Sequence, residues 1–300
     1  MIVTTGLTKR FGDVVALNGL SCTIGDGSIF GLVGSNGSGK STLLRTLSGV
    51  YYPDGGTAEI DGAPVFENPK VKQALFFVPD FPYFFTQANL LDMARLYRKV
   101  YQNWDEARFL ELSSMFPIDK KARIINMSKG MQRQCALILA LSTRPKYLFL
   151  DEIFDGLDPV IRQLLKRLLA REVGERGITI VIASHNLREL EDLCDHVGLL
   201  HKGGIVLEKE LDALKLGIHK VQAAFMPAIP RDAFERDLQL VKFDARGSLV
   251  NLVVRGDREE ILQKLGAMNP VFLEALPLTL EEVFISEMEV AGYDIDNILK

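Results

Sequence analysis

The sequence predicts an α/β protein with a mostly parallel sheet, followed by a small α+β domain. Short apolar segments alternate with helical stretches through most of the first 183 residues, which is typical of a parallel sheet covered by helices. One apolar segment, Ile29–Val33, leads directly into a glycine-rich loop and a helix. After Lys209 the pattern changes to strand-like segments interrupted by prolines. We therefore expect one domain over residues 1–214 and an accessory domain over residues 215–300.

The N-terminal segment is expected to form an antiparallel β part made of short strands and turns. Residues 14–17 and 20–24 are compatible with strands, and Asn18-Gly19 between them is a dipeptide typical of a hairpin turn. The other expected elements follow from the periodicity of apolar residues. Strands are expected at 58–60, 75–78, 147–150, 179–183, 221–225, 238–243, 249–254 and 271–276, and helices near 41–48, 88–100, 104–115, 129–142 and 159–173.

The composition is that of an ordinary globular protein, with 47% hydrophobic and 25% charged residues among 300. A net charge of −4 gives no indication of a nucleic-acid-binding surface. No apolar run approaches the roughly 20 residues that a membrane-spanning helix needs, so we do not expect the chain to cross a bilayer. The three cysteines, Cys22, Cys135 and Cys194, are far apart and odd in number, which favours core residues in a reducing cytosol over disulfides.

The glycine-rich loop has the pattern of a phosphate-binding loop. Its sequence, G-S-N-G-S-G-K-S-T, matches G-x-x-x-x-G-K-[ST] between a strand and a helix. The glycines let successive backbone N–H groups point at phosphate oxygens, and the N-terminus of the following helix adds to this attraction. Lys40 would reach the β- and γ-phosphates of a nucleotide, and the Ser41 hydroxyl would bind Mg²⁺. The candidate ATP-binding residues here are Gly34, Ser35, Asn36, Gly37, Ser38, Gly39, Lys40, Ser41 and Thr42.

Two adjacent carboxylates, Asp151 and Glu152, follow the apolar segment 147–150. Ligands of an open parallel sheet bind at the carboxyl ends of its strands. Asp151 is therefore a candidate ligand for Mg²⁺, and Glu152 is expected beside the γ-phosphate. Such a pair alone is equally compatible with a solvated loop, but the phosphate loop upstream favours the functional interpretation. Kinases, GTPases and helicases share these two motifs, so further residues have to distinguish among nucleotide enzymes.

Three more segments make that distinction. Met127-Ser128-Lys129-Gly130-Met131-Gln132 precedes an apolar helix, Gly156-Leu157-Asp158-Pro159 follows Glu152 closely, and Ile182-Ala183-Ser184-His185 ends a later strand. With all these motifs in this order and spacing, residues 1 to about 210 resemble the ATP-binding cassette (ABC) ATPases. The resemblance implies a P-loop ABC ATPase fold with a helical signature region.

The resemblance also implies roles for individual residues. Phe11 corresponds to the aromatic residue that stacks on adenine, Glu152 to the general base for the attacking water, and His185 to a residue that contacts the γ-phosphate. The segment Ser128, Lys129 and Gly130 corresponds to the signature loop, which caps the ATP held by the opposing subunit. The segment Gly156, Leu157 and Asp158 corresponds to a loop that crosses the dimer interface.

The sequence departs from the family pattern in two places. Lys129 and Met131 stand where the signature usually has Gly and Gln, although Ser128 and Gly130 remain. Asp80 stands where the family usually has a Gln that contacts Mg²⁺ and the attacking water. A carboxylate could ligate the metal but would act only as an acceptor. We therefore keep Asp80 as a candidate ligand beside Ser41 and Asp151.

Together these features predict an ATP-hydrolysing subunit of an ABC transporter that uses ATP and Mg²⁺. We expect it to lie in the cytoplasm on the inner face of the cell membrane, bound to an integral-membrane permease and to a second nucleotide-binding subunit, identical or similar to itself. No nucleic-acid partner is expected. The segment 274–284 resembles the tail of ATPases that serve bacterial exporters, which favours export. The aromatic segment 81–85 is expected either to dock the permease or to pack on the helix near 88–100.

Two alternative functions fit the sequence less well. ABC ATPases that act on ribosomes carry two cassettes in one chain, and those that act in DNA repair carry long coiled-coil insertions; neither feature occurs here. A small-molecule P-loop kinase would leave the segment 128–130 and His185 unexplained. The transported cargo cannot be inferred from this chain, because the membrane subunit would select it.

Overall fold

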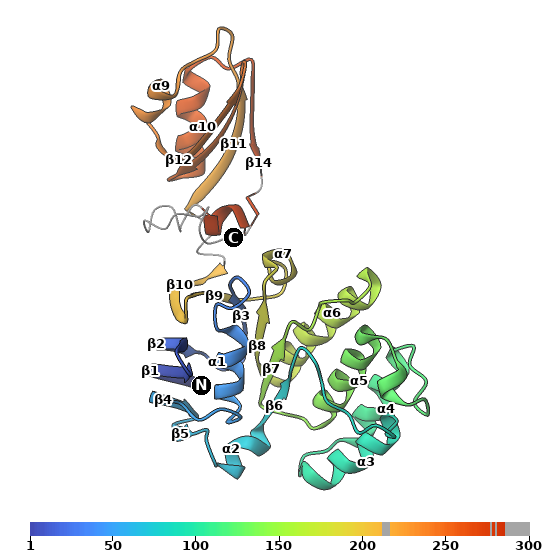
Figure 1. Cartoon of the computed structure of the whole chain (residues 1–300). Helices are drawn as coiled ribbons and strands as arrows, with labels where there is room; N and C mark the ends of the chain where they lie inside the picture. Colours follow the sequence, from blue (N-terminus) through green and yellow to red (C-terminus); the bar gives the residue numbers. More distant parts are fainter. Residues whose placement is uncertain (212–216, 277, 280, 286–300) are drawn as a thin grey trace. The chain divides into compact units, whose positions relative to one another are not determined.

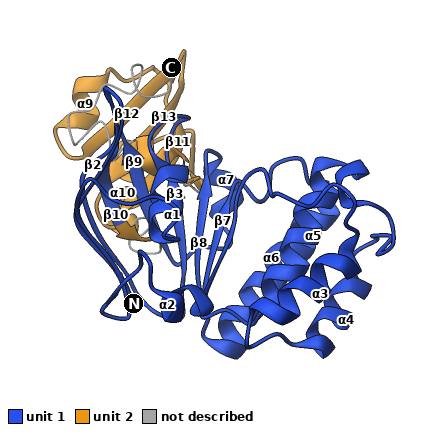
Figure 2. Ribbon diagram, turned by 60° about the horizontal axis from the view of Figure 1, so that its bottom comes forward, with its two compact units in different colours: residues 1–208 blue, residues 209–300 orange. Residues whose placement is uncertain are grey.

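The computed structural model describes residues 1–211, 217–276, 278–279 and 281–285 (Figure 1). The chain divides into two compact units, residues 1–208 and 209–300 (Figure 2). The expected domain boundary at residue 214 lies outside the described residues. None of the helices in the described ranges is long and apolar enough to span a membrane.

The first unit is built on a six-stranded sheet with the strand order β10-β9-β3-β8-β7-β6. Strand β3 pairs in parallel with β8 and β9, and β7 pairs in parallel with β6 and β8. Every residue of β3, β7 and β8 is buried, as expected for central strands of a sheet that is covered on both faces. The mostly parallel sheet is therefore confirmed. Its strands are β3 (Ile29–Val33), β6 (Leu75–Val78), β7 (Tyr147–Asp151), β8 (Thr179–Ser184), β9 (His196–His201) and β10 (Gly204–Glu210).

A second, antiparallel sheet of the first unit has the order β2-β1-β4-β5. Its strands are β1 (Ile2–Phe11), β2 (Val14–Ile24), β4 (Gly55–Ile60) and β5 (Ala63–Pro64). The hairpin turn expected at Asn18-Gly19 is wrong, because β2 continues through these residues. Gly19 has φ 62°, and the register of β1 against β2 shifts opposite it. A glycine in the left-handed region serves a β-bulge as well as a turn, which explains the misleading dipeptide.

Helix α1 (Lys40–Leu47) joins the two sheets into one core. Its Leu43, Leu44 and Leu47 pack in a cluster with residues of the antiparallel sheet such as Leu7 and of the parallel sheet such as Phe149. A short helix, α2 (Pro69–Ala74), precedes β6. The packing of α1 fixes where the helix begins, and therefore where the glycine-rich loop between β3 and α1 lies.

A group of helices, α3 to α6, lies beside the parallel sheet, on the side away from the antiparallel sheet (Figure 2). Helix α5 is buried over most of its length and is capped by Ser128, whose side chain accepts a hydrogen bond from the Met131 N–H at 3.2 Å. Asp158 caps α6 in the same way: its Oδ1 accepts hydrogen bonds from the Val160 and Ile161 N–H groups, both at 3.0 Å. The helical elements are α3 (Leu90–Val100), α4 (Glu106–Met115), η1 (Ile124–Asn126), α5 (Lys129–Ser142), α6 (Pro159–Arg176) and α7 (Leu187–Leu190).

The second unit contains an antiparallel sheet with the order β12-β13-β11-β14 and, among its described residues, the helices α9 and α10. Ile261 and Leu265 of α10 form one core with Leu252 of β13 and with Phe225 and Phe234. This agrees with the α+β character expected for the accessory part of the chain. The elements are β11 (Ile218–Ala224), α9 (Arg231–Glu235), β12 (Gln239–Arg246), β13 (Leu249–Arg255), α10 (Arg258–Ala267) and β14 (Phe272–Leu276).

Candidate nucleotide-binding site

The glycine-rich loop connects the carboxyl end of β3 to the N-terminus of α1. A Cβ atom on Gly34 would lie 2.3 Å from the Leu200 carbonyl oxygen, and one on Gly39 would lie 2.5 Å from the Ala16 carbonyl oxygen. Gly39 also has φ 111°, a conformation that other residues rarely adopt. These two glycines are therefore required for the tight path of the loop, which ends at the N-terminus of α1, the end of a helix that attracts anions.

The Lys40 ammonium folds back over the loop. It donates hydrogen bonds to the carbonyl oxygens of Gly34 at 2.6 Å and Ser35 at 3.2 Å, and it lies 3.8 Å from Oε1 of Glu152. Burial lowers the pKa of Lys40, and the neighbouring carboxylates of Glu152 and Asp151 partly oppose this shift. A buried ammonium with neutral carbonyls as its main partners is well suited to bind phosphate oxygens, which are stronger acceptors.

Ser41 and Asp151 are brought together from α1 and β7. The Ser41 hydroxyl donates a 3.0 Å hydrogen bond to Oδ1 of Asp151, whereas the buried Oδ2 has no partner among the described residues. Burial raises the pKa of Asp151; the Ser41 hydrogen bond opposes this, and the charge of Glu152 adds to it. An unpartnered carboxylate oxygen beside a hydroxyl offers the hard oxygen ligands that Mg²⁺ prefers, so these two residues fit the ion.

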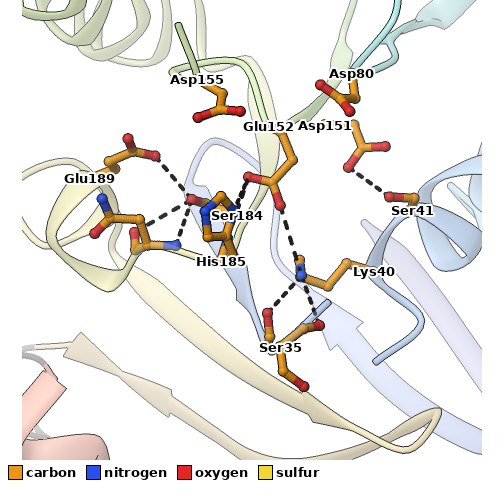
Figure 3. Close-up of polar contacts among 12 residues, drawn as sticks. Ser35, Lys40, Ser41, Asp80, Asp151, Glu152, Asp155, Ser184, His185 and Glu189 are labelled. Carbon is orange, nitrogen blue, oxygen red and sulfur yellow. Dashed lines mark hydrogen bonds and ion pairs between the residues drawn. The ribbon is translucent and has the colours of Figure 1, made fainter. Parts of the chain in front are cut away.

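Glu152 follows β7 and lies between Lys40 and His185 (Figure 3). Its Oε2 is 2.9 Å from Nδ1 of His185, a residue at the end of β8. The backbone of Glu152 has φ 49°, and its N–H donates to the Ala183 carbonyl at 2.9 Å. The carboxylate is thus held at the carboxyl edge of the sheet, at the same place as the phosphate loop.

The end of β8 is itself fixed by a buried contact. The Ser184 hydroxyl donates to Oε2 of Glu189 at 3.0 Å, and the Asn186 N–H donates to the Ser184 hydroxyl at 3.0 Å (Figure 3). These bonds order the chain on both sides of His185. Glu189 belongs to no recognisable sequence motif, although its place five residues after Ser184 is compatible with such a contact.

Asp80 is engaged by a residue that the sequence motifs did not single out. Its Oδ1 forms an ion pair with Nη2 of Arg133 on α5, and Nη1 of the same guanidinium donates to the Asp155 carbonyl. The charge of Asp80 is also among the causes that raise the pKa of Asp151, so Asp80 lies within electrostatic reach of the candidate metal ligands. Arg133 could have been noticed as a charged residue close to the apolar stretch 135–141 of this helix.

The signature and interface segments contact each other rather than the phosphate loop. A Cβ atom on Gly130 would lie 2.8 Å from the Gly156 carbonyl oxygen, so α5 and the segment 156–158 are in close contact there. Within the described part of the chain, no hydrogen bond or ion pair joins residues 128–130 to residues 34–42. These two groups of predicted site residues are therefore not brought together within one chain.

Phe11 lies at the end of β1 with 44% of its surface exposed. Its ring packs edge-on against Tyr51, with centroids 5.2 Å apart, and the Lys9 ammonium is 5.5 Å from its centroid. An exposed ring supported from one side can accept a planar ligand on its face. Tyr51 was not anticipated from the sequence, because nothing in its neighbourhood forms a motif.

Comparison with known proteins connects this site to one family. A family model described as ABC transporter matches residues 17–155. The ABC transporter ATP-binding protein YtrB of Bacillus subtilis is 32% identical over 287 residues, which cover 96% of this chain and 98% of YtrB. The bacitracin transport ATP-binding protein BcrA of Bacillus licheniformis is 36% identical over 221 residues, covering 72% of this chain and 71% of BcrA.

Solved structures agree with these relatives. An ATP-binding subunit of an ABC transporter, 26% identical, matches with a TM-score of 0.65 over 72% of this chain and 92% of its own. The ATP-binding cassette MJ0796, solved as a dimer in a post-hydrolysis state with ADP and Pi, matches with a TM-score of 0.64 over 70% of this chain and 99% of its own. At 22% identity the latter likeness concerns the fold alone. The chain belongs to the family of ABC transporter ATP-binding proteins and is an ATPase.

Proposed function

We propose that this chain is the ATP-hydrolysing subunit of an ABC exporter, peripheral on the inner face of the cell membrane, and that it drives a separate permease. The observation that carries the catalytic part is the cluster of Lys40, Ser41, Asp151, Glu152 and His185 at one edge of the parallel sheet. These residues come from three different elements and together supply a phosphate-binding cation, metal ligands and a carboxylate base.

In this proposal each task in ATP binding and hydrolysis belongs to a different residue of the chain. Lys40 exchanges its loop carbonyls for the β- and γ-phosphates of ATP, and Ser41 and Asp151 would hold Mg²⁺, which would supply positive charge beside the phosphates. Glu152 takes the proton of the attacking water, and His185 orients Glu152 through Nδ1 while its other ring nitrogen faces the γ-phosphate. Phe11 stacks on the adenine ring.

A second nucleotide-binding subunit completes the site. Ser128, Lys129 and Gly130 would cap the ATP held by the opposing subunit, and Gly156, Leu157 and Asp158 would cross the interface between them. The separation of residues 128–130 from residues 34–42 within one chain supports this arrangement. ATP would then close the pair and hydrolysis would release it, as in a two-state motor.

Export is proposed from the relatives and from the C-terminal segment. BcrA is named for bacitracin transport, and a 37% identical relative in Burkholderia lata is named for Nod factor export. The segment 274–284 resembles exporter tails, although residues 277 and 280 in it lie outside the described residues. We assign residues 1–214 to the nucleotide-binding domain and residues 215–300 to the accessory domain.

The permease is proposed to dock on the segment that follows Asp80. Phe81, Tyr83 and Phe85 are 69%, 78% and 54% exposed, whereas Phe84 is buried. Three rings of this segment are therefore candidate anchors for the permease, whereas Phe84 packs inside the fold. Exposed aromatic side chains grouped within five residues are characteristic of binding surfaces.

The full chain with Glu152→Gln tests this function. When the tagged variant is purified from its native membranes with ATP and Mg²⁺, an integral-membrane protein should remain bound to it. The unmodified chain should hydrolyse ATP only when a divalent cation is present. Metal-independent hydrolysis, or the absence of any membrane protein from the ATP-treated preparation, would contradict the proposal.

A further inference from the structure

Arg133 occupies the point where three segments of the candidate site meet. It belongs to α5, pairs with Asp80 after β6, and bonds to the carbonyl of Asp155 after β7. Its side chain is 5% exposed. A Cβ atom on Gly156 would lie 3.4 Å from Nη1 of Arg133, so the interface segment packs directly on the guanidinium.

A second contact joins α5 to the loop that follows β6. The Lys129 ammonium lies 5.3 Å from the centroid of the Phe81 ring, a cation–π arrangement. Asp80 and Phe81 are consecutive, and both are held by cations from the first turns of α5. The conformation of Asp80 is thus determined by α5 as well as by its own loop.

Burial makes this pairing necessary rather than incidental. A guanidinium in a mostly buried position is costly unless a carboxylate and further acceptors satisfy it, and Asp80 and Asp155 supply these. Conversely, Asp80 adds a negative charge near Asp151, at a site that must receive a polyphosphate. Without a cation beside it, this carboxylate would repel the nucleotide and would be open to a metal ion.

We propose that Arg133 is a positioning residue for the ATPase reaction, because its ion pair engages the Asp80 carboxylate and balances its charge within the chain. Asp80 is then not a ligand of Mg²⁺ in this protein, and its charge is balanced within the chain. This inference rests on the proposed function of the site. It adds a requirement that the other site residues do not impose. The residues at positions 80 and 133 must carry opposite charges, or both must be neutral.

The test breaks the ion pair from each side and measures ATP binding by titration calorimetry in EDTA, where neither metal nor hydrolysis contributes. Arg133→Gln leaves the Asp80 anion unpaired and should weaken ATP binding about tenfold or more. Asp80→Asn removes the anion and leaves a cation, so it should tighten ATP binding by about twofold to fivefold. The double variant should return to within about threefold of the unmodified chain.

Arg108→Gln is a matched control, because Arg108 is also a buried arginine of the helical region and pairs with Glu172 on α6. It should lower the melting temperature without changing the affinity for ATP. If Arg133→Gln does not fold, Asp80→Asn and the double variant decide the question alone, since the proposal requires tighter binding in the first and near-normal binding in the second.

Equal changes of the same sign in both single variants would mean that the pair is only structural and would overturn the proposal. A higher Mg²⁺ requirement for hydrolysis in Asp80→Asn would also overturn it, because Asp80 would then be a metal ligand. Failure of the proposed function is recognised separately, by an unmodified chain that binds no ATP.

Discussion

Nδ1 of His185 lies 2.9 Å from Oε2 of Glu152. Because an ionised carboxylate can only accept hydrogen bonds, this contact places a proton on Nδ1 of the imidazole. The other ring nitrogen is then the one that can turn toward a phosphate. The other carboxylate oxygen of Glu152 lies 3.8 Å from the Lys40 ammonium, so Glu152 connects the residue at the end of β8 with the phosphate loop.

Glu152→Gln should preserve ATP binding but lower hydrolysis by roughly 10²–10⁴-fold, the usual contribution of a general base. Glutamine has the same shape and cannot take a proton from water, so an ATP-bound dimer should accumulate. Turnover assays and size-exclusion chromatography with ATP would measure both effects. Glu175→Gln, the same change at an exposed position of α6, should have neither effect. Turnover near that of the unmodified chain would exclude Glu152 as the base.

Phe11→Ala should weaken ATP binding selectively, because stacking of a base on an aromatic ring contributes roughly 1–3 kcal/mol. Phe11→Tyr should be nearly neutral, since it keeps the ring. The exposed Tyr52, which packs edge-on against Phe66, provides a matched control: Tyr52→Ala should leave the affinity unchanged. Nucleotide titrations combined with melting of the nucleotide-free chain distinguish a role of Phe11 in ATP binding from a role in the stability of the fold. A lower melting temperature for Phe11→Ala without weaker ATP binding would show that the ring serves only the fold.

Tyr83→Ser combined with Phe85→Ser should leave ATP hydrolysis by the isolated subunit near normal but abolish co-purification with the permease. These two rings contact each other, with centroids 6.0 Å apart, and both are exposed. Val271→Ser with Phe272→Ser changes a comparable exposed apolar pair and should not affect co-purification. A permease that remains bound to the first variant would place the docking surface elsewhere.

Asp61 should contribute stability that depends on pH. Partial burial by itself would raise its pKa, but hydrogen bonds from Lys146 and from the Tyr147 hydroxyl outweigh this and hold the pKa well below the usual 3.8. A carboxyl whose pKa is lower in the folded state contributes its full stabilisation above the unfolded pKa and loses it as the pH falls through the folded pKa. The contribution is modest, because the side chains of Asp61 and Lys146 are about half exposed.

Asp61→Asn therefore should lower the melting temperature at pH 7, and its difference from the unmodified chain should shrink as the pH falls below about 4. The backbone at this position has φ 53°, which asparagine tolerates, so the change should not strain the turn. Lys146→Met should reduce the same pH dependence by removing a donor. A difference in melting temperature that stays constant from neutral to acid pH would contradict this account.

Motifs of contiguous residues could be read from the sequence because their chemistry is local. The strand Leu75–Val78 has the expected bounds, and the glycine-rich loop lies between a strand and a helix as predicted. The contact of Ser41 with Asp151 was also foreseeable, since parallel strands place their carboxyl ends at one edge of the sheet. Here the alternation of strands and helices is enough to predict which ends meet.

Other features depended on partners that local sequence does not name. Asn18-Gly19 is compatible with a turn or with a bulge, and pairing with β1 selected the bulge. Within the segment 81–85, one ring is buried and three are exposed, because the path of the loop rather than the residue type decides which side each ring faces. Neither outcome could be obtained from propensity alone.

The sequence by itself determined the nucleotide chemistry of this protein: a phosphate loop, two carboxylates after a strand and a histidine at the end of another. Only the tertiary structure decided which residue pairs with Asp80. Asp80 and Arg133 are 53 residues apart, and they meet because α5 packs against the sheet with Arg133 on its buried side. A buried arginine must find an acceptor, and the carboxylate in reach was the one that the motif alone would have assigned to the metal.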